Sequence, residues 1–276
     1  MIQDIDSHIF RNEYEHRQPS MGDITFIFQE RKILIKKEED QITFPTYKRL
    51  QDEKVNYNYL FAIDGEAYYL ADTKEVEVLE GYSWENINVI RTLQPKFLAF
   101  AAITAYHLFN WYNSNRFCGK CGLPMTHSPK ERALSCEGCG HMVYPRISPA
   151  VIVGITDGDR LLITRYAGRE SKRYGLVAGF CEIGESAEET VAREVMEEVG
   201  LKVKNICYYK SQPWGFSGDL LIGYFAEVDG SQEIVMDENE LSEAIWVKRE
   251  ELLSEDDGIS LTSEMMLYFK NQIRNE

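Results

Sequence analysis

The chain has 276 residues, of which 44% are hydrophobic and 27% are charged, so wholesale disorder is excluded and a sizeable core is expected. Forty-five acidic residues against thirty basic ones give a formal net charge of −15, which disfavours extensive non-specific binding to nucleic acid or anionic membranes. A small anionic substrate is compatible with this charge if metal ions or a local basic pocket neutralise it.

The first segment of the chain lacks the basic and apolar regions of a secretory signal. The most apolar run, residues 97–109, is shorter than the ~20 residues that a membrane-spanning helix needs. We therefore expect a cytoplasmic protein that makes no membrane contact. In a reducing compartment, the six cysteines are expected to bind metal or to remain free thiols.

Residues 1–93 are expected to form a small α+β module that consists mostly of strands and turns. Runs rich in β-branched and aromatic residues predict strands at 24–28, 32–36, 57–63 and 66–70. Asp64-Gly65, between the last two runs, is a strong hairpin signal. The module carries no catalytic motif, so packing or dimerisation is its expected role. A helix over residues 96–112 is then predicted within a linker segment, 94–115.

Residues 116–145 contain two C-x2-C pairs separated by fourteen residues, namely Cys118, Cys121, Cys136 and Cys139. Glycines beside each pair allow two knuckles that present four thiolates, a donor set typical of Zn²⁺. A closed four-thiolate site has no open position for water, so a structural zinc ribbon is expected. Many zinc ribbons bind nucleic acid, but only Lys130 and Arg132 are strongly basic between the pairs. Cys181 and Cys207 lie outside the pattern and are expected to be partly buried free thiols.

From residue 146 to residue 276 the pattern is mixed α/β. A hairpin is predicted from strands at 150–155 and 160–164 around Asp157-Gly158. Further strands and a final helix are predicted near 203–210, 219–228, 244–248 and 262–274. The segment 229–257 is markedly acidic, and for most of it a solvated face is expected.

A helix is predicted over residues 186–199. Ser186 and Glu189 form a capping-box pattern at its start, and Gly200 is placed to end it. Valines at every fourth position predict the edge of this helix that packs on a core.

The neighbouring edge of the same helix gathers three carboxylates. At ~100° per residue, Glu194, Glu197 and Glu198 fall within about 100° of one another. Such a cluster of oxygen ligands suits Mg²⁺ or Mn²⁺. An ordinary solvated acidic face is the alternative, and the three glutamates taken alone favour that alternative.

The full spacing of residues 179–201, G-x5-E-x7-R-E-V-x-E-E-x-G-L, resembles the signature of the Nudix hydrolases at every defined position. The resemblance implies an α+β protein, in which an α/β/α sandwich with a mixed sheet follows the zinc ribbon and the small amino-terminal α+β domain. It also implies hydrolysis of a nucleoside diphosphate linked to another group, with a divalent metal held by the helix. Arg193 matches the family arginine that orients the glutamates.

The same resemblance implies a set of metal ligands. Glu194 and Glu198 match the principal ligands, and Glu197 matches a further ligand or base. The backbone carbonyl of Ala178 matches a position that commonly joins the coordination. Glu240 matches a carboxylate that reaches the metal from a loop.

Residues 211–216, Ser-Gln-Pro-Trp-Gly-Phe, resemble the SQPWPFP element of the NADH pyrophosphatase branch of the Nudix family. The zinc ribbon and the sequence of residues 144–149 are similar to that branch as well. The implied substrate contacts are Glu131, Tyr144, Phe180, Gln212, Pro213, Trp214, Gly215, Phe216, Ser217, Gly218, Asp219 and Thr262. Aromatic faces at such positions suit a dinucleotide, because they stack on bases or on a nicotinamide ring. Gly215 and Ser217 replace family prolines and Asp219 replaces a serine, so a looser loop with an added negative charge is expected.

The branch implies cleavage of NADH or NAD⁺ into AMP and a nicotinamide mononucleotide, with Mg²⁺ or Mn²⁺ at the helix and structural Zn²⁺ in the ribbon. Removal of an NAD cap from RNA breaks the same bond, and a homodimer is the implied assembly. Two alternatives stay open. One is a Nudix hydrolase acting on ADP-ribose or a dinucleoside polyphosphate, and the other is a non-enzymatic zinc-ribbon protein that binds nucleic acid. The general base, a glutamate of the helix or Glu240, is not assigned by the pattern.

Overall fold

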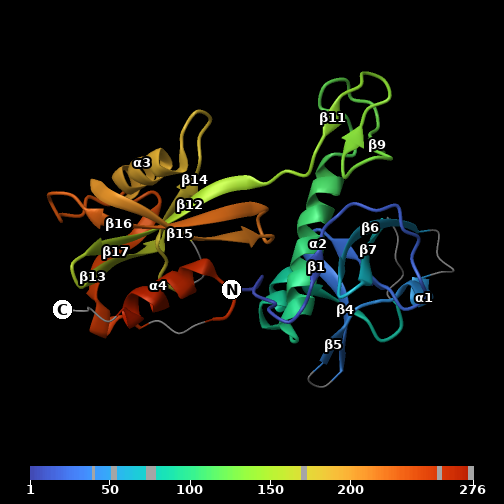
Figure 1. Cartoon of the computed structure of the whole chain (residues 1–276), viewed down its shortest axis with the longest axis horizontal. Coiled ribbons are helices and arrows are strands. Elements are labelled where there is room, and N and C mark those ends of the chain that lie inside the picture. Colours follow the sequence, from blue (N-terminus) through green and yellow to red (C-terminus); the bar gives the residue numbers. More distant parts are fainter. Residues whose placement is uncertain (39–40, 51–54, 73–78, 169–172, 254–256, 273–276) are drawn as a thin grey trace. The chain divides into compact units, whose positions relative to one another are not determined.

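The computed structural model describes residues 1–38, 41–50, 55–72, 79–168, 173–253 and 257–272 (Figure 1). The chain divides into two compact units. The amino-terminal unit contains residues 2–146 and 215–217, and the other unit contains Met1, 147–214 and 218–276. Among the described residues, no helix combines the length and the apolar character that crossing a membrane requires.

Small sheets make up much of the amino-terminal unit, as its β-rich pattern predicts. One sheet has the order β1-β6-β7-β2, made of β1 (Phe10–Arg11), β6 (Asn56–Ile63), β7 (Glu66–Asp72) and β2 (Ile24–Phe26). Another has the order β3-β4-β5 with β8 paired to β4, made of β3 (Phe28–Gln29), β4 (Lys32–Glu38), β5 (Gln41–Thr43) and β8 (Ser83–Asn86). A short helix, α1 (Tyr47–Leu50), lies between β5 and β6 in the chain. The predicted hairpin is confirmed, because Asp64 and Gly65 join β6 to β7 with φ values of 54° and 85°.

The predicted linker helix forms as α2 (Lys96–Ser114), after the 3₁₀ turn η1 (Ile87–Thr92). Many of its Ala, Leu and Phe side chains are buried. The ring of Phe100 packs edge-on against that of Phe10 on β1, with centroids 4.9 Å apart. The helix is therefore a core element of the amino-terminal unit.

The cysteine-rich segment of this unit carries a small antiparallel sheet. Its order is β11-β10-β9, made of β11 (Met142–Val143), β10 (Leu134–Ser135) and β9 (Thr126–His127). The N–H groups of Gly122 and Gly140 each donate, at 2.8 Å, to the carbonyl of the first cysteine of their pair. Both glycines have positive φ, 77° and 69°, which glycine adopts without steric cost. The two predicted knuckles are confirmed by these equivalent turns.

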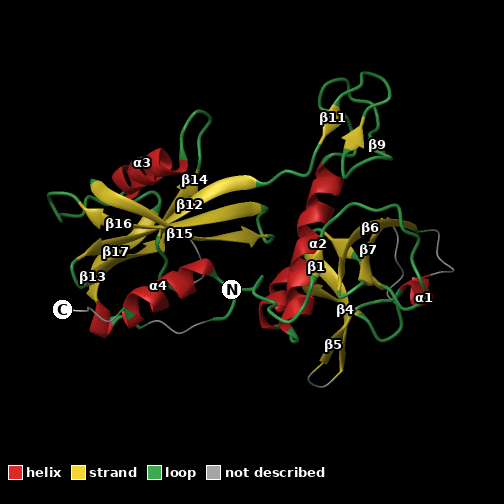
Figure 2. Cartoon of the chain, in the orientation of Figure 1, coloured by secondary structure: helices red, strands yellow, loops and turns green. Residues whose placement is uncertain are grey.

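A mixed sheet forms the centre of the other unit (Figure 2). Its order is β15-β16-β12-β13-β17, with β14 also paired to β12. The strands are β12 (Ser148–Asp157), β13 (Arg160–Tyr166), β14 (Val177–Phe180), β15 (Val203–Trp214), β16 (Asp219–Val228) and β17 (Leu241–Lys248). Strands β12 and β16 run parallel, and the other pairs run antiparallel. The predicted strands are confirmed, although β15 is longer than expected and β14 was not predicted.

Helices α3 (Ala187–Val199) and α4 (Leu261–Asn271) lie over opposite faces of this sheet, and a 3₁₀ turn, η2 (Arg249–Glu251), follows β17. Successive residues of β12 serve different faces, because side chains alternate along a strand. Val151 and Val153 belong to the core that α3 covers, whereas Ile152 belongs to the core that α4 covers. This is the sandwich that the resemblance implies. Residues 273–274 of the predicted final helix lie outside the described residues.

Candidate active site

Helix α3 begins and ends where the sequence predicts. The Ser186 hydroxyl accepts the N–H of Glu189 at 3.2 Å, and the Glu189 carboxylate accepts the N–H of Ser186 at 2.8 Å, which completes the capping box. Gly200 ends the helix with φ 68°. The valines of the core-facing edge are fully buried, namely Val191, Val195 and Val199. Their packing fixes the direction of the neighbouring edge, which carries the glutamates.

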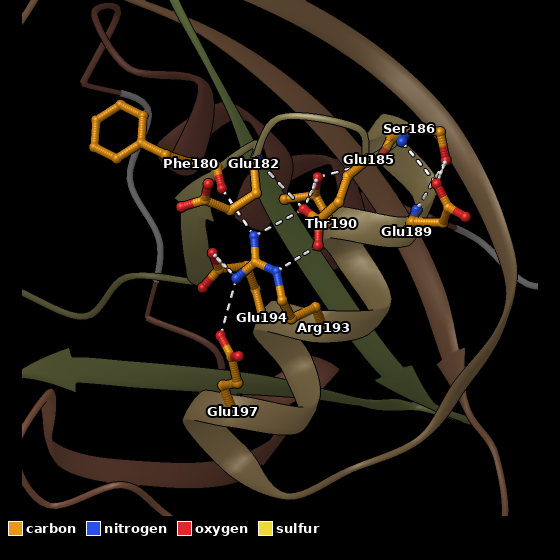
Figure 3. A network of polar contacts seen from close by, with 9 residues as sticks. All are labelled: Phe180, Glu182, Glu185, Ser186, Glu189, Thr190, Arg193, Glu194 and Glu197. Atoms are coloured by element: carbon orange, nitrogen blue, oxygen red, sulfur yellow. Dashed lines mark hydrogen bonds and ion pairs between the residues drawn. The ribbon is translucent and has the colours of Figure 1, made fainter.

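Arg193 lies at the centre of a polar network on this edge (Figure 3). Its guanidinium donates to the two carboxylate oxygens of Glu185, at 2.7 and 3.0 Å, and to the carbonyl oxygen of Phe180, at 2.9 Å. It also donates to Glu194 at 2.7 Å and to Glu197 at 2.9 Å. The pairing with Arg193 lowers the pKa of Glu185 to about 2, and the pairing with Glu185 is the largest influence that raises the pKa of Arg193. These contacts support the orienting role that the resemblance implies for Arg193.

Glu185 is a residue for which no role was predicted. It anchors Arg193, and its carboxylate also accepts the Thr190 hydroxyl at 2.9 Å. The signal was present in the sequence, because this glutamate is one of the defined positions of the 179–201 spacing. An isolated glutamate ahead of a helix gives no indication of such a contact.

Glu194 and Glu198 are buried, with 9% and 1% of their surface exposed. Burial raises the pKa of Glu194, Arg193 opposes this rise, and the negative charges of Glu197 and Glu240 add to it. The Glu240 side chain is therefore close enough to Glu194 to repel its charge. Carboxylates gathered in this way cost free energy unless a cation lies between them. The donor set, made of oxygens alone, fits Mg²⁺ or Mn²⁺.

The backbone of Gly179 lies directly against the carboxyl group of Glu194. A methyl group built on Gly179 would overlap the carboxyl carbon and both oxygens of Glu194. The φ angle of Gly179 is not in the left-handed region, so the close approach of Glu194 is what requires a glycine here.

We expect Gly179→Ala to displace the Glu194 carboxylate and to weaken binding of Mn²⁺ by roughly 10- to 100-fold, the scale of loss seen when the groups that orient metal ligands are changed. Gly175→Ala is a matched control, because a methyl group there would meet Tyr166 at an ordinary distance of 3.7 Å. Titrations with Mn²⁺, monitored by electron paramagnetic resonance, compare the affinities of the two variants. Equal affinities would show that Glu194 does not need its present position.

Two further predicted ligands lie outside α3. Ala178 is half-buried on β14, and the hydroxyl of Tyr166 donates to its carbonyl oxygen at 3.4 Å. Glu240 is exposed in the loop between β16 and β17. The structure thus brings Glu240 toward Glu194 from a distant part of the sequence.

The predicted substrate contacts of this unit have different environments. Phe180 ends β14 with 54% of its surface exposed. Gln212 is fully buried; its amide group donates to the carbonyl of Ile259 and accepts the N–H of Leu261, both at 2.7 Å. Gln212 therefore fixes the start of α4, where Thr262 lies in the first turn.

Trp214 and Asp219 are partners in the pairing of β15 with β16. The N–H of Gly218 donates to the carbonyl of Trp214 at 3.0 Å and closes the turn between these strands, while Pro213 is exposed on β15. Asp219 is 7% exposed. The added negative charge that the sequence places near the substrate is therefore a buried carboxylate at the start of a strand.

The middle of the 211–219 segment belongs to the amino-terminal unit. Phe216 is buried, and the guanidinium of Arg91 lies 4.2 Å from the centroid of its ring. A methyl group built on Gly215 would overlap the carbonyl oxygen of Ile103. The Cβ of a proline would meet the same atom, which explains a glycine where the family element has a proline. Ser217 is exposed.

The remaining predicted substrate contacts, Glu131 and Tyr144, meet each other in the cysteine-rich segment. The hydroxyl of Tyr144 donates to the Glu131 carboxylate at 3.1 Å. This bond and the charge of Glu131 raise the pKa of Tyr144, because ionisation would place two negative charges together. The Tyr144 ring is 54% exposed and so is available to a ligand.

The four cysteines of this segment offer sulfur atoms that all lie within 4.8 Å of one another. The Sγ atoms of Cys118 and Cys139 are 3.6 Å apart, and those of Cys121 and Cys136 are 3.4 Å apart. The N–H of Lys120 donates to the sulfur of Cys118 at 3.4 Å. Within the described part of the chain, this is the one group of three or more Cys, His, Asp or Glu side chains whose ligand atoms lie so close to one another. The donor set fits a closed structural Zn²⁺ site.

Of the two remaining cysteines, Cys181 is half-buried, as predicted, and packs against the core under α3. Cys207 is exposed, so the prediction of partial burial was wrong for this residue. It lies on β15, which is an edge strand of the sheet and has a neighbouring strand, β16, on one side only.

Comparisons with known proteins agree with this architecture. Residues 146–267 match the family model described as the NUDIX domain. Residues 146–267 are therefore a Nudix domain. Residues 113–144, directly before the Nudix domain, match the model described as the NADH pyrophosphatase zinc ribbon domain. The fold predicted from the sequence, a mixed-sheet Nudix sandwich after a zinc ribbon and an α+β module, is confirmed.

Curated relatives of the chain include proteins named NAD-capped RNA hydrolase NudC. That of Pseudomonas fluorescens (strain Pf0-1) is 40% identical over 189 residues, which cover 67% of this chain and 66% of the relative. That of Salmonella heidelberg (strain SL476) is 46% identical over 145 residues, which cover 52% of this chain and 56% of the relative. The matches thus span between 56% and 66% of the length of these relatives.

A solved structure is also similar to the chain. The NUDIX hydrolase from Nitrosomonas europaea is 18% identical, with a TM-score of 0.49, and the match covers 56% of this chain and 90% of that one.

Proposed function

We propose that this chain hydrolyses the pyrophosphate bond of NADH or NAD⁺ to AMP and a nicotinamide mononucleotide, and that it removes NAD caps from RNA by the same cleavage. The observation that carries the proposal is the combination of a Nudix helix, with its glutamates gathered on one edge, and a zinc ribbon of the NADH pyrophosphatase type in one chain. The name of the similar proteins, NAD-capped RNA hydrolase, supports the second activity.

In this proposal Glu194 and Glu198, with the carbonyl of Ala178 and the carboxylate of Glu240, hold Mg²⁺ or Mn²⁺. The bound metal would neutralise the pyrophosphate, lower the pKa of a bound water and stabilise charge on the leaving phosphate. Arg193 holds the carboxylates of Glu194 and Glu197 in place through hydrogen bonds at 2.7 and 2.9 Å.

Two of the carboxylates, those of Glu197 and Glu240, are exposed and so can accept a proton from water. Arg193 already binds one oxygen of Glu197. A carboxylate that is paired with a guanidinium is a weaker base. The same argument applies to Glu240, which binds the metal in this proposal, so the role of general base is assigned to one of these two glutamates and not to the buried Glu194 or Glu198.

The exposed ring of Phe180 is proposed to stack on the base or on the nicotinamide ring. Its backbone carbonyl accepts a hydrogen bond from Arg193, so the residue that carries this ring lies beside the glutamate edge. Gln212 and Asp219 are proposed to support the substrate loop from inside, since both are buried.

Phe180→Ala is expected to lower kcat/KM for NADH by roughly 5- to 150-fold, because a stacked ring contributes ~1–3 kcal/mol. Binding of Mn²⁺ should be unchanged, since the helix glutamates are untouched. Ile183→Ala is a matched control, because Ile183 is a fully exposed apolar residue of the loop that follows β14. Steady-state kinetics measure kcat/KM for NADH in both variants. Full activity in Phe180→Ala would mean that the ring binds elsewhere.

A substrate panel tests the proposed function directly. NADH, NAD⁺, ADP-ribose, diadenosine tetraphosphate and NAD-capped RNA are each incubated with protein and Mg²⁺ or Mn²⁺, and the products are separated chromatographically. We expect AMP and the nicotinamide mononucleotide from NADH or NAD⁺, and a 5′-monophosphate RNA from the capped substrate. Turnover of ADP-ribose or the dinucleoside polyphosphate without turnover of NADH would overturn the proposed substrate class.

We further propose one structural Zn²⁺ per chain, a cytoplasmic location and a homodimer. Large apolar side chains are exposed in the ribbon, namely Phe117, Leu123 and Met142, and they support self-association. Light scattering coupled to gel filtration tests the assembly, and a monomer at micromolar concentration would contradict it.

A further inference from the structure

The loop between β16 and β17 is docked on the carboxyl end of α3. The N–H of Val235 donates to the carbonyl of Val199 at 3.0 Å, and the N–H of Asp237 donates to the carbonyl of Glu198 at 2.9 Å. The last carbonyls of a helix have no partner within the helix, so the loop supplies donors that α3 lacks. Gly200 allows this approach, because a methyl group there would lie only 2.8 Å from Val235.

Asp237 organises the turn that follows. Its carboxylate accepts the backbone N–H of Asn239 at 2.9 Å and the side-chain amide of Asn239 at 2.8 Å. Its carbonyl accepts the N–H of Glu240 at 3.2 Å and the N–H of Leu241 at 2.9 Å. From the other side, the N–H of Ala167 donates to the carbonyl of Glu240 at 2.8 Å. One residue therefore links the backbone of Glu240 to the end of the catalytic helix.

We propose that Asp237 is a positioning residue of the divalent-metal site, which holds the Glu240 carboxylate toward Glu194 and Glu198. The inference rests on the metal site of the proposed function, but it does not depend on the substrate. Glu238, the neighbour of Asp237, is exposed and takes part in none of the bonds of the turn.

Binding of Mn²⁺ to the full chain, measured by electron paramagnetic resonance, tests this role. Asp237→Ala should weaken binding by about 5- to 30-fold, the equivalent of one to two hydrogen bonds. Asp237→Asn keeps the acceptor oxygen and should stay within about threefold of the original affinity. Glu238→Ala removes the same charge from the same loop and should leave the affinity unchanged. A full loss in Asp237→Asn, or an equal loss in Glu238→Ala, would mean that charge alone matters and would overturn the inference.

A second set of variants separates positioning from general damage to the fold. In a Glu240→Ala background, Asp237→Ala should add less than about a twofold loss, since the group that it positions is gone. An undiminished loss in this background would overturn the inference. Asn239→Ala removes only the side-chain amide donor, and we expect a loss of about 2- to 5-fold. If Asp237→Ala melts at a lower temperature, this milder variant still tests whether the turn positions Glu240. An unchanged affinity for Mn²⁺ in Asn239→Ala would count against that role.

These outcomes are independent of the substrate panel. Unchanged affinity for Mn²⁺ in Asp237→Ala contradicts the positioning role, whatever the protein hydrolyses. Normal binding of Mn²⁺ without hydrolysis of NADH or NAD⁺ contradicts the proposed function and leaves the positioning role standing.

Discussion

Glu198→Gln is expected to lower the turnover of NADH by roughly 100-fold or more while the protein stays folded, because loss of a charged metal ligand removes several kcal/mol of transition-state stabilisation. Glu198 is 1% exposed, and glutamine has nearly the same shape. Burial of an ionised carboxylate costs free energy, so the neutral amide should keep or raise the melting temperature.

Steady-state kinetics over a range of Mg²⁺ concentrations, together with thermal melting, measure both effects. Glu188→Gln is the control, because Glu188 is exposed on the same helix and glutamine still accepts the Tyr224 hydroxyl that Glu188 accepts at 3.1 Å. Near-normal turnover of Glu198→Gln at saturating Mg²⁺ would remove this carboxylate from the mechanism.

Removal of zinc is expected to unfold the cysteine-rich segment. Elemental analysis of purified protein should find about one zinc per chain, bound by Cys118, Cys121, Cys136 and Cys139. The sheet there consists of two-residue strands, which are too short to be stable alone, so metal binding supplies the free energy that keeps this segment folded.

Cys136→Ser is expected to release zinc and to lower the melting temperature, since Cys136 is buried in the ribbon. Cys207→Ser is the matched control, because Cys207 is an exposed cysteine outside the cluster. Calorimetry of the two variants and of chelator-treated protein compares their stability. If the zinc-free protein melts at the same temperature as the zinc-bound form, the structural role is wrong.

Local sequence signals predict much of the fold. The limits of α3 follow from Ser186, Glu189 and Gly200, because a capping box and a left-handed glycine act within a few residues. The Asp-Gly hairpins and the cysteine knuckles follow for the same reason, since a positive φ at glycine needs no distant partner.

The rest of the site depends on partners far away in the sequence. Gln212 is a motif residue, but its bonds to Ile259 and Leu261 give it a buried, structural place. The sequence alone predicts Asp219 to be an added charge in the substrate loop, but the pairing of β15 with β16 buries this residue. Asp237 lies in an acidic stretch for which solvation was the expected explanation. Its role follows only from the docking of that loop on the end of α3, about forty residues earlier in the chain.

The burial of Phe216 under Arg91 bears on the order in which the chain folds during synthesis. Translation delivers residues 2–146 first, and roughly seventy more residues must leave the ribosome before 215–217 can join the same unit. At ~5–20 residues per second, the surface around Arg91 and Ile103 stays uncovered for about 3.5 to 14 seconds before this segment is synthesised. During this interval a nascent chain exposes apolar surface that the finished protein hides. Chaperone binding to ribosome-bound chains should therefore be strongest at lengths between these two points.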